Sequence, residues 1–310
     1  MKLYLTGVSG LLGGNLAYLL RERAELFGCD RNETAIPGLS LSVFDCLDRD
    51  RLRQDLERIR PDAVIHCAGF TSVDGCERDP NKAYQVNVVL SGKVARICRD
   101  LGMKLVFLSS DAVYDGAAKG LHRESEETSA CNVYGKSKIL AEESILEAGG
   151  KPEPLILRTN FLGYNVRRRT GSFEWMLESM LSGKPVTLFE DVYFSPLSIP
   201  FLTEVIWECI RRDLGGVYNA SCAGSVTKLK FGNLVKQQFG LSNAVIIPGK
   251  VADAPLAARR SLNMGMDSSG LAHMLGMTMD SPSDTVRTLY EQYCRGYPQI
   301  LRSFAVPGRK

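Results

Sequence analysis

The chain has 310 residues, 45% of them hydrophobic, and a formal net charge of +3. This length allows one large hydrophobic core or two modest ones. A charge so close to balance argues against nucleic acid or a membrane surface as the main partner. No stretch approaches the roughly 20 apolar residues of a membrane span. We therefore expect a soluble, cytoplasmic protein without a signal peptide.

The nine cysteines and three histidines show no metal-ligand spacing. The cysteines form no C-x-x-C pair, and an odd count in a chain this long argues against a disulfide framework. We expect small, buried, reduced thiols instead. Because His66, His122 and His273 are widely separated, we predict no metal site. His66 lies in an apolar run and is interpreted as a packed core residue.

A glycine-rich loop follows the first apolar run of the chain. Residues 2–6 have the composition of a buried parallel strand, and residues 16–20 resume with helical periodicity. Gly7 lets the chain turn off the strand, Gly10 lets a pyrophosphate approach the backbone, and Gly13 lets the helix pack close to the sheet. The helix N-terminus adds free N–H groups and a positive dipole end. This order predicts a dinucleotide site.

The second predicted strand, residues 24–29, ends at Asp30. An acid at this position accepts hydrogen bonds from the adenosine ribose and disfavours a 2′-phosphate. Arg31 follows directly and could pair with that phosphate. The two residues favour different cofactors, so the choice between NAD(H) and NADP(H) stays open.

The rest of the first half alternates between strands and helices. Apolar runs predict strands at residues 39–44, 62–67, 104–108 and 154–157, and periodic segments predict helices at 48–60, 79–100 and 133–147. This alternation predicts a Rossmann-type, doubly wound parallel α/β sheet that binds ligands at the carboxyl ends of its strands.

The pattern loosens beyond residue 158. Helices are expected at residues 173–181, 201–212 and 228–239, and strands at 215–220 and 244–247. We predict an NAD(P)-binding Rossmann domain over residues 1–160, to which later segments could return, and a smaller C-terminal α/β lobe over residues 161–310 that mainly binds substrate. The arginines at 167–169 could contact a substrate diphosphate, but are interpreted as a solvated loop.

Tyr134 and Lys138 form a second motif at the start of a predicted helix. Residues four apart emerge on one helix face, one turn apart. A free tyrosine, with a pKa near ~10, is a poor proton donor unless its phenolate is stabilised, which a nearby ammonium does. The pair can therefore act as a general acid/base. Ser110, at the end of a predicted strand, is placed to donate a hydrogen bond to the same substrate oxygen.

Five segments together resemble an extended short-chain dehydrogenase/reductase: TGVSGLLG, DAVIHCAG, FLSSDAVYDG, NVYGKSK and LRTNFLG. Within that superfamily the chain most resembles the dTDP-4-dehydrorhamnose reductase branch. The segments typical of the branch are residues 71–74 (TSVD), 109–116 (SSDAVYDG) and 132–136 (NVYGK).

The resemblance implies hydride transfer from the nicotinamide to C4 of a nucleotide-linked 4-keto-6-deoxy sugar. Tyr134 would protonate the alkoxide, and Lys138 would bind the nicotinamide ribose and lower the pKa of Tyr134; with Ser110 they form the implied catalytic trio. The implied substrate-binding residues are Thr71, Asp111, Phe161 and Arg260. The implied cofactor-binding residues are Gly7, Gly10, Leu11, Leu12, Gly13, Asp30, Arg31, Asp45, Cys46, Cys67, Ala68, Gly69, Asn87, Ser109, Tyr134 and Lys138.

The chain also departs from the branch. Phe161 stands where members often carry a tryptophan, Leu197 where a threonine is common, and Asn15 where some members offer an acid to magnesium. Asp111 is open to a catalytic or a structural interpretation.

Two alternative functions remain: an epimerase of the same superfamily, or a non-catalytic NADP-binding regulatory subunit resembling the methionine adenosyltransferase β subunit. A 4,6-dehydratase is disfavoured because Ala112 stands where such enzymes have a glutamate. The resemblance also suggests a homodimer through the helices near Lys82 and Tyr134.

Overall fold

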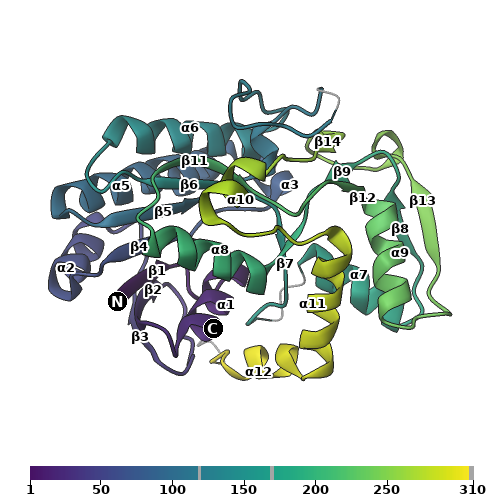
Figure 1. The fold of residues 1–310 in the computed structure, drawn as a ribbon, viewed down its shortest axis with the longest axis horizontal. Helices are drawn as coiled ribbons and strands as arrows, with labels where there is room; N and C mark the ends of the chain where they lie inside the picture. Colours follow the sequence, from purple (N-terminus) through teal and green to yellow (C-terminus); the bar gives the residue numbers. More distant parts are fainter. Residues whose placement is uncertain (118–119, 168–170, 307–310) are drawn as a thin grey trace.

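The computed structural model describes residues 1–117, 120–167 and 171–306 of the chain. Its centre is a parallel sheet of seven strands in the order β11-β6-β5-β4-β1-β2-β3 (Figure 1). The strands are β1 (Lys2–Thr6), β2 (Glu25–Asp30), β3 (Leu39–Val43), β4 (Ala63–His66), β5 (Lys104–Leu108), β6 (Leu155–Thr159) and β11 (Gly216–Ala220). The strand order reverses between β1 and β4, where such sheets bind ligands. The predicted Rossmann-type fold is confirmed.

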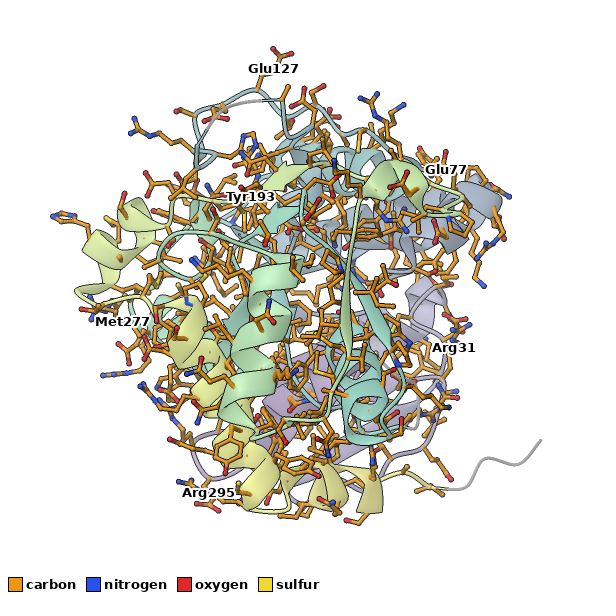
Figure 2. The ribbon with its side chains drawn as sticks, turned by 90° about the vertical axis from the view of Figure 1, so that its right-hand side faces the viewer. Arg31, Glu77, Glu127, Tyr193, Met277 and Arg295 are labelled. Carbon is orange, nitrogen blue, oxygen red and sulfur yellow. The ribbon has the colours of Figure 1, made fainter. Side chains whose placement is uncertain are left out.

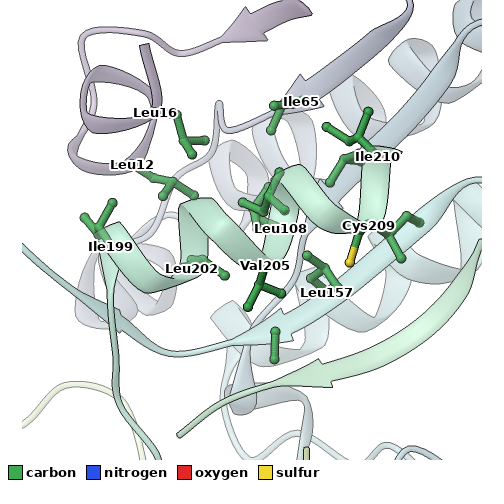
Figure 3. Close-up of a cluster of buried hydrophobic side chains, with 14 of the residues drawn as sticks. Leu12, Leu16, Ile65, Leu108, Leu157, Ile199, Leu202, Val205, Cys209 and Ile210 are labelled. Carbon is green, nitrogen blue, oxygen red and sulfur yellow. The ribbon is translucent and has the colours of Figure 1, made fainter. Parts of the chain in front are cut away.

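Helices cover both faces of this sheet because successive strand residues point to opposite sides. Leu3 and Leu5 face one core with α1 (Leu11–Leu20), α8 (Ile199–Arg211) and α10 (Ser269–Leu275). Tyr4, between them, faces a second core with α2 (Arg49–Ile59), α5 (Leu90–Leu101) and α6 (Val133–Ala148). Figure 3 shows α8 side chains packed among residues of α1, β5 and β6 in the first core.

The long helix predicted over residues 79–100 is interrupted. It consists of α4 (Pro80–Ala83), a π-helical segment η1 (Tyr84–Val89) and α5, and it follows a short helix, α3 (Val73–Arg78), that the sequence did not indicate. The Asp79 side chain caps α4 by accepting a hydrogen bond from the Lys82 N–H at 3.0 Å. The π turn carries Asn87, whose side chain contacts two other segments of the site. π-Bulges occur frequently at functional sites.

The second half of the chain contributes to both parts of the molecule. β11, α8 and α10 complete the large sheet and its cover, whereas the remaining elements form a smaller lobe. The lobe contains β7 (Phe161–Leu162), α7 (Ser172–Leu181), β8 (Val186–Phe189), β9 (Tyr193–Phe194), β10 (Leu197–Ser198), β12 (Val226–Thr227), α9 (Lys228–Gln238), β13 (Ile246–Gly249), β14 (Asn263–Met264), α11 (Pro282–Cys294) and α12 (Tyr297–Ser303). The boundary at residue 160 stays a prediction.

The lobe contains several short strands that pair in three small sheets. β10 pairs with β7, β12 and β14 flank β9, and β13 pairs with β8. The strand expected at residues 244–247 lies two residues later, at Ile246–Gly249, and α11 and α12 were not predicted. Every described helix is too short or too polar to cross a lipid bilayer. All nine cysteines are free thiols.

Asn15 joins the first helix to the lobe from a fully buried position. Its Nδ2 donates hydrogen bonds to the carbonyl oxygens of Leu11, at 2.6 Å, and Tyr164, at 2.8 Å. Its Oδ1 accepts a hydrogen bond from the Tyr297 hydroxyl at 2.9 Å. The amide is therefore satisfied by three segments that lie far apart in the sequence.

Leu202 tests whether α8 belongs to the core of the large sheet. It is fully buried among side chains of α1 and the sheet (Figure 3). We expect Leu202→Ala to lower the free energy of unfolding by about 2–5 kcal/mol, because truncation leaves a cavity in a close-packed core. Leu181→Ala, at a position that is 46% exposed in α7, should change it by less than about 0.5 kcal/mol. Equilibrium urea unfolding measures both, and an equally small effect of the two substitutions would contradict this packing.

Candidate active site

The glycine loop between β1 and α1 is closed tightly onto its neighbours. Gly7 has φ +71°, and a Cβ there would lie 2.8 Å from the Cα of Ala68, in the loop after β4. A Cβ on Gly13 would collide with the Gly7 carbonyl oxygen. Gly10 is the N-cap of α1 without a side-chain cap, which leaves the N–H groups of the first turn, beginning with Leu11 and Leu12, open to an anion.

Asp30, at the end of β2, is buried and holds the glycine loop from the side. Its Oδ2 accepts a hydrogen bond from the Ser9 N–H at 2.9 Å. Its Oδ1 accepts two from Asn32, from the backbone N–H at 2.9 Å and from Nδ2 at 3.0 Å. Asp30 therefore supports the loop directly, besides facing the place where an adenosine ribose is expected.

Arg31 and Asp45 lie at the outer rim of this region. Arg31 is exposed, and its Nη1 is 3.8 Å from Asp45 Oδ2; its label stands at the margin of the molecule in Figure 2. So loose and exposed a pair leaves the guanidinium able to turn toward a ligand phosphate. Cys46, which follows Asp45, is buried, and its Sγ lies 3.2 Å from the Sγ of the buried Cys29.

The loop after β4 is fixed by the amide of Asn87. Asn87 Oδ1 accepts a hydrogen bond from the Phe70 N–H at 2.7 Å, and Nδ2 donates to the Phe70 carbonyl oxygen at 3.0 Å. Nδ2 also donates to Ser137 Oγ at 2.9 Å, and Ser137 Oγ donates to the Tyr134 carbonyl oxygen at 2.7 Å. One amide thus holds residues 67–70, which include Cys67, Ala68 and Gly69, in register with α6.

His66, at the end of β4, is a packed core residue. Its Nδ1 is hydrogen-bonded to Thr6 Oγ1 at 2.7 Å and its Nε2 to Ser91 Oγ at 3.2 Å. Burial lowers the pKa of His66 to about 3, and the nearby Lys138 charge acts in the same direction. The imidazole is therefore neutral at ordinary pH.

Ser110, Tyr134 and Lys138 meet at the carboxyl end of β5. Tyr134 and Lys138 lie one turn apart on α6, and Ser110 lies close enough to the Tyr134 hydroxyl to oppose the rise of its pKa. Lys138 Nζ donates a hydrogen bond to the Leu108 carbonyl oxygen at 2.6 Å. Its ammonium also lies 4.3 Å from the ring centroid of Phe107. The structure brings the predicted trio together.

Burial moves the pKa values of Tyr134 and Lys138 in opposite directions. It raises the pKa of Tyr134 to about 12, although the nearby Ser110 side chain works against the rise. It lowers the pKa of Lys138 to about 8, with the Glu142 carboxylate acting in the opposite direction. Before a ligand enters, the site therefore favours a neutral Tyr134 phenol, and it makes the Lys138 ammonium easier to deprotonate.

The start of α6 is positioned by several independent contacts. Asn132 Oδ1 accepts a hydrogen bond from the Gly135 N–H at 2.9 Å, so it caps the helix. Glu77 of α3, labelled in Figure 2, accepts one from the Val133 N–H at 3.1 Å. A Cβ on Gly135 would collide with the Ala112 carbonyl oxygen, so the helix packs directly on the turn after β5.

A buried ion pair lies one further turn along α6. Glu142 is bound by Arg158 of β6, with Nη2 2.7 Å from Oε2, and the Ser109 hydroxyl donates to Glu142 Oε1. Arg158 Nη1 also donates to the Tyr114 hydroxyl at 2.9 Å. We did not predict Glu142 or Arg158. The spacing of Tyr134, Lys138 and Glu142, four residues apart on one face, was the available signal.

Of the predicted substrate residues, Asp111 lies in contact with the trio. It is 3% exposed, and its Oδ1 accepts a hydrogen bond from Ser110 Oγ at 3.0 Å. Its Oδ2 accepts one from Asn160 Nδ2 at 2.5 Å. Burial raises the pKa of Asp111, whereas the Asn160 hydrogen bond and the Lys228 charge oppose the rise. Sequence reasoning missed Lys228, which no motif surrounds.

The other predicted substrate residues have different surroundings. Thr71 is exposed beside Gly69. Phe161 is half-buried against the core of the large sheet. Arg260 forms an ion pair with Asp74 of α3, with Nη2 2.9 Å from Oδ1, at a cavity of about 400 Å³. Of the arginine cluster, residues 168–169 lie outside the described residues.

The family follows from comparison with known proteins. The RmlD substrate binding domain family matches residues 1–294. This chain belongs to that family. It is 30% identical to a dTDP-4-keto-6-deoxy-D-glucose reductase of Streptomyces niveus, over 81% of each chain. It is 28% identical to a probable low-salt glycan biosynthesis reductase of Haloferax volcanii, over 93% of this chain and 97% of the other.

The fold agrees with that of a solved structure. The dTDP-4-dehydrorhamnose reductase of Bacillus anthracis in complex with NADP superposes with a TM-score of 0.83, over 94% of this chain and 99% of the other, at 23% identity. The resemblance stated from the motifs is thus confirmed at the level of the RmlD family.

Gly13→Ala tests the dinucleotide site. We expect the added Cβ to push α1 away from Gly7, since it would also lie 2.9 Å from the Gly7 carbonyl carbon. The affinity for NADPH should fall at least about tenfold, which corresponds to ~1.4 kcal/mol. Gly270→Ala is the matched control, because a Cβ there meets its nearest atom at 3.8 Å. Fluorescence titration measures both. A folded Gly13→Ala protein with unchanged affinity would place the cofactor elsewhere.

Proposed function

We propose that the chain is an NAD(P)H-dependent reductase of a nucleotide-linked 4-keto-6-deoxy sugar. The observation that carries this proposal is that Ser110 lies beside the Tyr134 hydroxyl, one helical turn from the buried ammonium of Lys138. The site lies at the carboxyl end of β5, and the loop after the adjacent β4 is packed against the glycine loop. The relatives that are named as reductases support the reaction class.

The residues around the glycine loop fit a dinucleotide. A Cβ would fill the space at Gly7 and Gly13, and the N-terminus of α1 presents free N–H groups for a pyrophosphate. Asp30, Arg31 and Asp45 would face the adenosine, and Lys138 the nicotinamide ribose. When bound, the nicotinamide supplies the hydride. The loosely paired Arg31 could bind the 2′-phosphate of NADP(H), whereas the carboxylate of Asp30 favours NAD(H). Both cofactors are therefore tested in the assay.

The protein side of the reaction is a proton transfer at the ketone oxygen. The Ser110 hydroxyl turns from Asp111 and donates a hydrogen bond that orients this oxygen, and Tyr134 gives it the phenolic proton as the alkoxide forms. A phenol with a pKa of about 12 would be a weak acid. The Lys138 ammonium stabilises the phenolate, so it lowers that pKa when the proton leaves.

We also propose that the protein forms a homodimer and acts in the cytoplasm. Large apolar side chains are exposed on the helices expected at the dimer interface: Tyr84 in η1 is 48% exposed, and Leu140 and Leu146 in α6 are 42% and 48% exposed. Nine free thiols are typical of a reducing compartment.

Tyr134→Phe tests the catalytic assignment. We expect kcat for reduction of a dTDP-4-keto-6-deoxyhexose to fall by about 10²- to 10⁴-fold, because the variant lacks the proton that neutralises the alkoxide. Cofactor affinity should stay unchanged. Tyr293→Phe, at a half-exposed ring on α11, is the matched control. Oxidation of NADPH and NADH, followed separately by absorbance, measures the rates and identifies the preferred cofactor.

Other outcomes of this assay separate the alternatives. Sugar conversion without net cofactor oxidation would indicate an epimerase. Tight cofactor binding without turnover would indicate a regulatory subunit. Wild-type rates in Tyr134→Phe would disprove the role of Tyr134.

The pH profile tests Lys138. Its pKa lies at about 8, whereas an unperturbed lysine titrates near ~10.4. Because reduction needs the ammonium, kcat/KM should fall as pH rises through about 8. Tyr134, with a pKa of about 12, remains protonated over that range. Lys138→Arg, which keeps its charge, should lose this alkaline limb even where its rate is low. A flat wild-type profile up to about pH 10 would contradict the assignment.

A further inference from the structure

The smaller lobe contains an aromatic pocket with one cation at its wall. The pocket has a volume of about 260 Å³ and lies between α7, β8, β9 and α9. Its larger lining side chains are Phe173, Trp175, Met176, Phe189, Phe194 and Phe231. Among the described lining residues, Lys228 alone carries a charge. A flat, largely apolar group linked to an anion has the chemistry that this wall complements.

The backbone of Lys228 is fixed at the start of α9, and its ammonium lies on an aromatic ring. It is the first residue of α9, behind the N-cap Thr227, and its N–H donates to the Val192 carbonyl oxygen at 3.0 Å. Its Nζ lies 3.2 Å from the ring centroid of Phe194. No hydrogen-bond acceptor for this ammonium exists among the residues that the structure describes. An ammonium that lies on an aromatic face without a hydrogen-bond acceptor can bind an anionic ligand.

Lys228 also connects the pocket with the catalytic end of β5. Its charge attracts the carboxylate of Asp111. Asp111 in turn accepts the hydrogen bond from Ser110. Lys228 therefore touches the aromatic pocket on one side and interacts on the other with the carboxylate that binds Ser110. A ligand that reaches from the aromatic pocket to Ser110 would complement these groups with a flat ring at one end, a reacting carbonyl at the other, and negative charge between them.

We propose that Lys228 is a specificity-determining residue that binds the diphosphate of the nucleotide sugar. The proposal rests on the reductase function proposed above. By this contact the chain distinguishes a nucleotide-linked sugar from a free sugar or a nucleoside. The aromatic pocket supplies affinity for the ring, and Lys228 supplies the preference for charge, since an ammonium recognises phosphate as a point charge.

The test compares ligands with and without phosphate. Thymidine and thymidine diphosphate, and the matching uridine pair, are titrated calorimetrically into the NADPH-loaded protein. We expect Lys228→Met to weaken diphosphate binding about ten- to hundredfold and to leave nucleoside binding unchanged, as for one lost charge-assisted hydrogen bond. Lys228→Arg should recover most of the affinity. Lys230→Met, at an exposed lysine on the same helix, is the matched control.

Kinetics supply a second readout. With the keto sugar, Lys228→Met should raise KM and change kcat little, because the contact acts in binding. An unchanged diphosphate affinity in Lys228→Met, equal losses for nucleoside and diphosphate, or a wild-type protein that binds neither would overturn the proposal. A Lys228-dependent preference for diphosphate in a protein without turnover would support it while refuting the reductase function. Turnover that is indifferent to Lys228 would do the reverse.

Discussion

The buried ion pair between Glu142 and Arg158 is the constraint on which the geometry of the site depends. Both residues are more than nine-tenths buried, and removing one partner of such a pair costs about 3–5 kcal/mol because the other charge is stranded. The pair fastens α6 to β6, and the Ser109 hydroxyl extends it to the end of β5. Since Tyr134 and Lys138 lie on the same face of α6, their distance from Ser110 is set by this attachment and not by their own contacts alone.

A second attachment links the same helix to the loop after β4. Asn87 binds the loop after β4 and Ser137 with a single amide, and this loop lies directly against Gly7. The cofactor loop and the catalytic helix are thus linked through one side chain. The π turn is the local irregularity that accompanies this arrangement, since the rest of the helix has ordinary α geometry.

The sequence predicted the parts that depend on local pattern. The glycine spacing, the alternation of strands and helices, and the Tyr134–Lys138 pair each follow from geometry over a few residues, and the structure has the expected elements there. Lys228 and Arg158 were not predictable in this way, because the residues with which they interact lie more than 15 positions away in the sequence. The short helix α3 and the π turn were missed for a related reason. Tertiary hydrogen bonds, rather than intrinsic propensity, stabilise them.

Asn15 has a consequence for motion. Its amide joins α1 to Tyr164 and Tyr297, and all of its hydrogen-bonding atoms are used inside the core. A hinge opening of the lobe against the sheet would have to break these bonds without water to replace them, at a cost of about 1–3 kcal/mol for each stranded polar group. Domain rotation is therefore a poor route for ligand entry in this protein. Rearrangement of surface loops, with the sheet and the lobe staying fixed against each other, is the less costly way to admit a cofactor and a substrate.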